Sequence, residues 1–258
     1  MNEVASTQVV PVNGIDLWVE RRGAGAPLLL LHGGGGIGQH WRLIFDAVPP
    51  GFELIIPDLR GHGRSTNPSG RIIFRQLALD VLALLDRLQV DRCSAIGMSL
   101  GAKTLLHVAT MQPSRVDAMV LVSAAPHFPE PTRALMRAAA SAPHAPADWA
   151  RMREWHVHGD AQIAALWEMP GLFADDREEM SFTAARLAGI QARTLVVHGD
   201  RDVLYPVSLA MELHAGIPGS HLWVIPNGGH PPIFGEMAPL FVRTALAYLH
   251  HWQSDHGR

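Results

Sequence analysis

The stretch Gly97-Met98-Ser99-Leu100-Gly101 combines residue types and spacing that could support chemistry. It fits the pattern G-x-S-x-G, in which a serine hydroxyl serves as a nucleophile. The apolar run CSAIG precedes Ser99, and LGAKTLLHVAT follows with helical spacing until Pro113. A strand, a sharp turn and a helix in this order hold a serine hydroxyl out at the end of a sheet. A serine that only caps the helix is the alternative interpretation.

The elements that would position Ser99 form an alternating pattern of strands and helices. Segments 7–12 and 15–20 flank Asn13-Gly14, a strong hairpin signal. Further apolar runs are typical of strands buried on both faces of a parallel sheet: 27–33, 52–58, 92–97, 116–124, 194–200 and 221–227. Between most of them lie amphipathic segments, such as 74–88 with its apolar residues at helical spacing. The sequence therefore predicts an α/β protein with a mostly parallel, eight-stranded sheet flanked by helices.

Residues 126–189 interrupt this alternation. They contain no strand-like run and are rich in Ala, Arg, Trp and Met, with scattered Pro and Gly. We expect several short helices here, inserted after a strand as a lid over the carboxyl edge of the sheet. The expected organisation is thus a core made of residues 1–125 and 190–258, with a helical lid of residues 126–189 inserted in it.

Composition narrows the class of protein. The chain has 258 residues, 48% hydrophobic and 17% charged, with a net charge of −3, as in an ordinary globular protein. Without a basic excess, nucleic acid is not an expected partner. The apolar runs are too short to span a bilayer, and the N-terminal residues do not resemble a secretory signal. One cysteine, Cys93, leaves no intrachain disulfide. We expect a cytoplasmic protein that acts on a small molecule, and its oligomeric state is not predicted.

The fifteen histidines raise the question of a metal. His156 and His158 are two apart, which would place them on different faces of a helix, and His250 and His251 are adjacent. No cluster of Cys, His or carboxylate residues has the spacing of metal ligands. The glycine-rich stretch 32–36 also lacks the remaining residues of a nucleotide-binding motif. We therefore expect neither a metal nor another cofactor.

Five stretches in a fixed order resemble the signature set of the α/β-hydrolase superfamily. They are HGGGG at 32–36, PDLRGHGRS at 57–65, GMSLG at 97–101, HGDRDVLYP at 198–206 and NGGHPPIFGE at 227–236. The resemblance spans essentially the whole chain apart from the insert near 127–190. It implies the α/β-hydrolase fold and a catalytic triad in the order Ser, Asp, His.

A serine hydroxyl needs an adjacent base, and the base needs an orienting carboxylate. His230 follows the last apolar run, in a Gly-Gly-His loop, and is the candidate base. Asp200 and Asp202 are both candidates for the acid. The superfamily places this residue three positions after the glycine, which implies Asp202. A second Val-His-Gly-Asp stretch, ending at Asp160, follows a helical pattern, and Asp160 is predicted to cap the next helix.

Acyl transfer also needs hydrogen-bond donors for the developing oxyanion. The resemblance implies the backbone amides of Gly34 and Leu100, with Gly35 as a possible substitute because the run of four glycines blurs the register. Aromatic and methionine side chains in the insert predict an apolar pocket, although they could equally pack the lid against the sheet. The pocket residues predicted here are Gly35, Trp41, Trp155 and Trp167.

We expect a serine hydrolase that cleaves an ester or lactone of a small, largely apolar substrate. A serine nucleophile disfavours the epoxide-hydrolase and dehalogenase branches, which by resemblance use aspartate. Tyr205 and Tyr248 also fall outside the insert, which argues against an epoxide-activating tyrosine. Carbon–carbon hydrolases of aromatic degradation are the alternative, but these typically have tryptophan after the catalytic histidine, where this chain has Pro231. A non-catalytic small-molecule receptor on the same fold is a third possibility.

Overall fold

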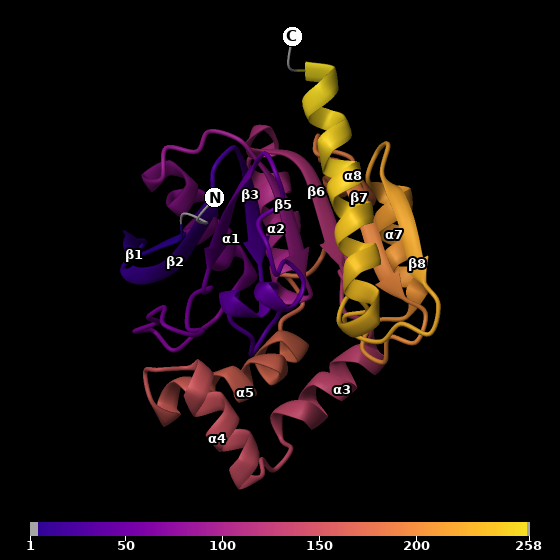
Figure 1. Ribbon diagram of the computed structural model, residues 1–258. Coiled ribbons are helices and arrows are strands. Elements are labelled where there is room, and N and C mark those ends of the chain that lie inside the picture. Colours follow the sequence, from indigo (N-terminus) through magenta and orange to yellow (C-terminus); the bar gives the residue numbers. More distant parts are fainter. Residues whose placement is uncertain (1–4, 257–258) are drawn as a thin grey trace.

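An eight-stranded sheet forms the centre of the computed structural model, which describes the backbone of residues 5–256 and the side chains of residues 5–250 (Figure 1). The strand order is β1-β2-β4-β3-β5-β6-β7-β8. The pairs β1–β2 and β2–β4 are antiparallel, and the others are parallel. The strands are β1 Ala5–Val12, β2 Ile15–Gly23, β3 Ala26–Leu31, β4 Phe52–Pro57, β5 Cys93–Met98, β6 Val116–Val122, β7 Arg193–Gly199 and β8 His221–Ile225.

The apolar runs form strands because both of their faces are covered. In β3, Leu29 and Leu31 belong to one hydrophobic cluster, whereas Leu28 and Leu30 belong to another. All four side chains are fully buried. Successive side chains of a strand point to opposite faces, so a continuous apolar run supplies both layers of core. The predicted α/β fold with eight mostly parallel strands is confirmed, including the hairpin at Asn13-Gly14.

Helices cover both faces of the sheet. Side chains of α1, α2 and α7 join the first hydrophobic cluster, and those of α8 and η1 join the second. Figure 1 shows α8 (yellow) crossing in front of the sheet beside β6 and β7. Outside the insert, the helices are η1 Gly38–Leu43, α1 Phe74–Arg87, α2 Leu100–Met111, η2 Pro113–Arg115, α7 Val207–Gly216, η3 Gly235–Met237 and α8 Ala238–His256.

The residues between β6 and β7 form helices α3 Glu130–Ala140, α4 Pro146–Trp155, α5 Asp160–Asp175 and α6 Ala184–Leu187. Helices α3, α4 and α5 lie together beyond one end of the sheet, at the bottom of Figure 1. A single β-bridge between His127 and Ser181 joins the two ends of the segment. The helical character expected of this insert is therefore present, whereas its division from the core and its role as a lid stay predictions.

The turn between β5 and α2 contains the sharpest packing constraint in the core. Ser99 adopts φ 49°, ψ −107°, and its amide donates to the carbonyl of Val122 at 2.8 Å. Here Gly101 packs against β3 so closely that an added Cβ would lie 2.3 Å from the carbonyl oxygen of Leu31. A Cβ on Gly97 would lie 2.6 Å from Gly101. Only glycine at both positions permits this approach of helix and strand.

His156 connects the insert to the core. It follows α4 rather than lying on a helix with His158, and only 1% of its surface is exposed. The amide of Gly63 donates to its Nδ1 at 2.8 Å, and its Nε2 donates to the carbonyl of Gly35 at 3.2 Å. Burial lowers the pKa of His156, which favours the neutral imidazole that this donor–acceptor pattern requires. The insert is therefore anchored to two loops at the carboxyl edge of the sheet.

We expect Gly101→Ala to lower the free energy of unfolding by about 1–3 kcal/mol, because the added methyl group overlaps the backbone of β3. Helix propensity alone would favour alanine by about 1 kcal/mol, so a net loss must be steric. Urea unfolding measures the change. Gly189→Ala is the matched control, since its Cβ would meet only the carbonyl of Arg186 at 3.4 Å. Equal stabilities of the two variants would contradict the close approach.

Candidate active site

The structure brings Ser99, His230 and Asp202 together from three loops that follow parallel strands. The Oγ atom of Ser99 lies 2.9 Å from Nε2 of His230, and Nδ1 of His230 lies 2.7 Å from Oδ2 of Asp202. A carboxylate only accepts hydrogen bonds, so Nδ1 carries the proton and Nε2 accepts from the serine hydroxyl. The hydroxyl of Ser99 does not cap α2. The arrangement is that of a nucleophile, a base and an orienting acid.

The carboxyl group of Asp202 is fully buried and fully hydrogen-bonded. Its Oδ1 accepts from the amides of Leu204 and Tyr205, at 2.9 and 3.0 Å. Burial by itself raises the pKa of this carboxyl. The hydrogen bond and charge of His230, together with the two amides, outweigh burial and lower the pKa below its usual range. Asp202 is therefore held as a carboxylate that can stabilise a protonated His230.

The two other candidate acids lie on the surface. Asp200 is exposed at the end of the β7 segment. Asp160 is the first residue of α5 and pairs with Arg153 at 2.7 Å, with its side chain 55% exposed. Both are therefore placed as turn and helix-start residues, and neither carboxyl is within hydrogen-bond distance of His230.

Two residues with unpaired backbone amides, Gly34 and Leu100, line the cavity together with Ser99. A Cβ added to Gly34 would lie 3.9 Å from the Cβ of Leu100, so these residues are neighbours beside Ser99. Neither amide donates a hydrogen bond to any residue in the part of the chain that the structure describes. Leu100 is also the first residue of α2, where helix amides are unpaired and favour negative charge. These amides are available to an oxyanion, and the assignment of Gly34 and Leu100 to that role stays a prediction.

A cavity of about 410 Å³ opens onto Ser99 and His230. The core contributes Gly34, Gly35 and Leu100 to its lining, and the insert contributes mostly apolar side chains. Trp167 lies among these, with His144 stacked on its ring at 3.6 Å and Trp149 edge-on at 4.4 Å. His144 itself lines the cavity, and the other insert residues that do so are Met136, Ala139, Met152, Leu166, Met169, Pro170 and Phe173.

Two predicted pocket residues do not line this cavity. Trp41 is fully buried in the hydrophobic cluster on the α8 face of the sheet, so its prediction was wrong. Trp155 packs edge-on against His40 at 4.5 Å and is absent from the cavity wall. Which layer each ring enters depends on the backbone direction of η1 and α4, which the residue type does not encode.

Sequence reasoning missed three polar residues that line the cavity, His144, Lys103 and Tyr205. Lys103 is four residues after Ser99 on α2, and this helical spacing was a usable signal. Tyr205 lies outside the insert, but its ring packs edge-on to His230 with centroids 5.2 Å apart. Its position outside the insert, from which the sequence argued against an epoxide-activating tyrosine, therefore does not keep Tyr205 away from the site.

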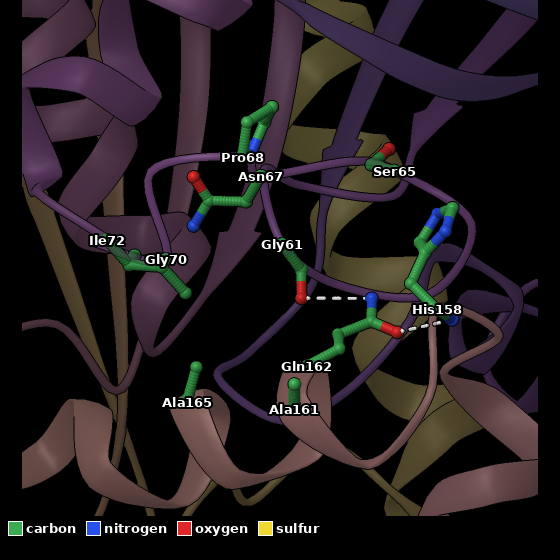
Figure 2. Close-up of a pocket in the computed structure, with 10 residues that line it drawn as sticks. All are labelled: Gly61, Ser65, Asn67, Pro68, Gly70, Ile72, His158, Ala161, Gln162 and Ala165. Carbon is green, nitrogen blue, oxygen red and sulfur yellow. Dashed lines mark hydrogen bonds between the residues drawn. The ribbon is translucent and has the colours of Figure 1, made fainter.

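A second cavity, of about 300 Å³, lies between residues 61–72 and the start of α5 (Figure 2). Ser65 lines it, but this hydroxyl donates to the carbonyl of Asp58 at 2.6 Å and accepts from the amide of Trp18. Figure 2 shows Gln162 bridging the cavity wall, with Nε2 donating to the carbonyl of Gly61 at 3.1 Å. The polar groups here hold the insert against the core and leave no paired nucleophile and base.

Within residues 5–256, no three His, Cys, Asp or Glu side chains gather as ligands of one metal ion. The same residues contain no helix with the length and apolar character needed to cross a membrane.

Comparison with known proteins identifies relatives that cover most of this chain. A family model described as alpha/beta hydrolase fold matches residues 26–182. RutD of Pseudomonas savastanoi pv. phaseolicola, a hydrolase by name, is 30% identical over 250 residues, which cover 88% of this chain and 95% of RutD. The 2-hydroxy-6-oxononadienedioate/2-hydroxy-6-oxononatrienedioate hydrolase 2 of Pseudomonas putida is 29% identical over 262 residues, 87% of each chain. The solved structure of Est816, described as an N-acyl homoserine lactone degrading enzyme, is 27% identical with a TM-score of 0.72, covering 93% of this chain and 99% of its own.

The hydrogen bond between Asp202 and His230 can be tested by substituting Asp202 and its neighbour Asp200 in turn. We expect Asp202→Asn to lower kcat by about four orders of magnitude, because an amide NH₂ at this position favours the wrong imidazole tautomer. Asp200→Asn is the matched control and should retain activity within a few-fold. A crippled Asp200→Asn protein beside a mildly affected Asp202→Asn protein would reverse the assignment.

Proposed function

The chain belongs to the alpha/beta hydrolase fold family, and on that premise we propose that it is a serine hydrolase that cleaves a carboxylic ester or lactone. The observation that carries this proposal is the continuous hydrogen-bond chain from Asp202 through His230 to Ser99. It ends at a hydroxyl that opens into a largely apolar cavity. Relatives named for hydrolysis, including a lactone-degrading enzyme, support the same class of reaction.

In the proposed mechanism, Ser99 attacks the carbonyl carbon while His230 takes the hydroxyl proton as general base. The resulting oxyanion accepts hydrogen bonds from the amides of Gly34 and Leu100. Protonated His230 then donates its proton to the leaving alcohol, and an acyl-enzyme remains on Ser99. A water molecule, deprotonated by the same imidazole, releases the acid and regenerates the serine. Asp202 stabilises the imidazolium at both steps.

The lining of the cavity supports a largely apolar substrate. Methionine, leucine and aromatic side chains from α3, α4 and α5 form most of the wall. Removing apolar surface from water contributes about 25 cal/mol per Å², so this wall would stabilise an apolar acyl or alcohol group. We propose that the insert acts as a lid, which excludes water and selects the substrate while the core performs the chemistry.

Carbon–carbon bond hydrolysis is the second candidate. It is favoured by the similarity to the Pseudomonas putida enzyme, which is named as a hydrolase of 2-hydroxy-6-oxononadienedioate. Against it, Pro231 follows His230 where the carbon–carbon hydrolases that the sequence resembles typically have tryptophan. Assaying an ester panel of graded acyl length together with a 2-hydroxy-6-oxo-dienoate ranks the two reactions by kcat/KM.

We expect a fluorophosphonate to label Ser99 covalently, with complete loss of ester hydrolysis, and Ser99→Ala to lower kcat by roughly four to six orders of magnitude. Mass spectrometry of the labelled peptide identifies the serine. Ser123→Ala is the matched control, because Ser123 also follows a parallel strand with a positive φ, 50°. Labelling of a different serine would exclude the proposed nucleophile. Tight binding of esters with no turnover by the unmodified chain would favour a receptor.

The lid proposal predicts that Trp167→Ala raises KM for a long-chain ester by about ten- to hundredfold, since about 1.5–3 kcal/mol of apolar contact is lost. A short acetate ester does not reach this ring and should be affected only slightly. Trp155→Ala is the matched control, because Trp155 does not line the cavity. Equal losses on short and long esters contradict the lid role. With an unchanged melting temperature they would implicate Trp167 in the chemical step, and with a lowered one in packing.

A further inference from the structure

Lys103 is the only lysine among the 21 Lys and Arg residues of the sequence. It lies on α2, and its amide donates to the carbonyl of Ser99 at 3.1 Å, one helical turn back. Its side chain is only 2% exposed and lines the same cavity as Ser99 and His230. The mechanism above does not use this amine. A buried cation in a largely apolar wall is unfavourable unless something pairs with it, so its presence there requires an explanation.

The groups around the Lys103 amine offset little of the cost of burying its charge. Nζ donates one hydrogen bond, to the hydroxyl of Tyr205 at 3.0 Å, and lies 4.6 Å from the centre of that ring. Among the residues that the structure describes, no carboxylate lies within 4.0 Å of Nζ. Asp202 raises the pKa of Lys103, but the larger effect of burial lowers it to about 7. Asp202 acts only from a distance, and no carboxylate of the described residues makes a direct ion pair with the ammonium.

The two side chains leave hydrogen-bond donors free. An ammonium has three N–H groups, and Tyr205 accepts one of them. Because the tyrosine oxygen accepts this bond, its own O–H is available to another group. Burial, reinforced by the charge of Asp202, raises the pKa of Tyr205, so the phenol keeps its proton. Lys103 and Tyr205 thus present an N–H and an O–H side by side, on α2 and on the loop after β7.

We propose that Lys103 and Tyr205 bind a carboxylate of the substrate, so that the ester or lactone cleaved at Ser99 carries a second, ionised carboxyl group. The inference rests on the proposed function for the identity of the bond that is cleaved. A carboxylate fits because its two oxygens match the two donors and its single charge balances one ammonium. A phosphate dianion would leave an unpaired charge in the apolar cavity. The methionine, leucine and aromatic side chains of the wall would contact the intervening carbon chain.

The subsite can be tested by binding alone, in a Ser99→Ala background that performs no turnover. The probes are the monomethyl esters of succinate, glutarate and adipate, each paired with its primary amide, which has the same shape without the charge. Titration calorimetry should show at least one acid binding about ten- to hundredfold tighter than its amide, the range for hydrogen bonds to charged groups. Lys103→Met should remove this preference. Arg177→Met, at an exposed residue of the insert, removes the same charge and should retain it.

Turnover by the chain with Ser99 intact gives the second measurement. Lys103→Met should raise KM for the preferred acid more than for its amide, by the same ten- to hundredfold, and Tyr205→Phe should reduce the preference severalfold. In the monomethyl esters the carboxylate belongs to the acyl part of the substrate. A second pair, 3-acetoxypropanoate and its amide, places the carboxylate in the alcohol part of the ester instead. A preference for the acid over the amide in either pair supports the subsite. Failure of every ester to turn over, with the binding preference intact, would reject the hydrolase but not the subsite.

Three results would overturn the subsite. One is equal binding of acids and amides in both halves. Another is an equal loss on acid and amide in Lys103→Met, which would place Lys103 in the chemical step. The third is a lowered melting temperature of Lys103→Met with the preference intact, which would make this lysine a packing residue, since methionine in its place is apolar and fills similar volume.

Discussion

The passage of β5 into α2 through one residue, Ser99 at φ 49°, is the constraint on which the site depends. The turn is possible only because Gly97 and Gly101 let the helix approach β3 to within a distance that a side chain would block. It holds the hydroxyl clear of α2 and places Leu100 at the first position of that helix, directly after Ser99. The positions of the Ser99 hydroxyl and of the proposed oxyanion donor Leu100 therefore depend on one backbone geometry, and Asp202 and His230 must reach this point from other loops.

The parallel arrangement of the strands brings Asp202 and His230 to Ser99. The loops after β7 and β8 emerge at the same edge of the sheet as the loop after β5, so Asp202 and His230 reach Ser99 although 131 residues separate the serine from the histidine. Buried hydrogen bonds then fix the orientation of these side chains. Two backbone amides orient the carboxylate of Asp202, and this in turn selects the imidazole tautomer with a free Nε2.

The insert completes the cavity without contributing to the hydrogen-bond chain. Its attachment depends on neutral His156, which accepts from Gly63 and donates to Gly35, the neighbour of Gly34. The same contact that holds the insert therefore also supports the glycine-rich loop. Lys103 and Tyr205 pair beside Ser99 and His230 on the core side of the cavity, while the insert contributes His144 and otherwise apolar side chains. The hydrogen-bond chain thus comes from the core alone, whereas both the core and the insert line the cavity.

Local patterns in the sequence were sufficient to predict the strands, the hairpin at Asn13-Gly14 and the turn at Ser99. Apolar runs and glycine spacing determine the backbone conformation within a few neighbouring residues. His230 and the choice between Asp200 and Asp202 needed motifs from a resemblance, since the pairing spans distant loops. The side chains that share the cavity were decided only by tertiary structure. Trp41 points into the opposite layer, and Lys103 meets Tyr205 across 102 residues. Such meetings depend on how helices pack over a twisted sheet, which no local residue pattern encodes.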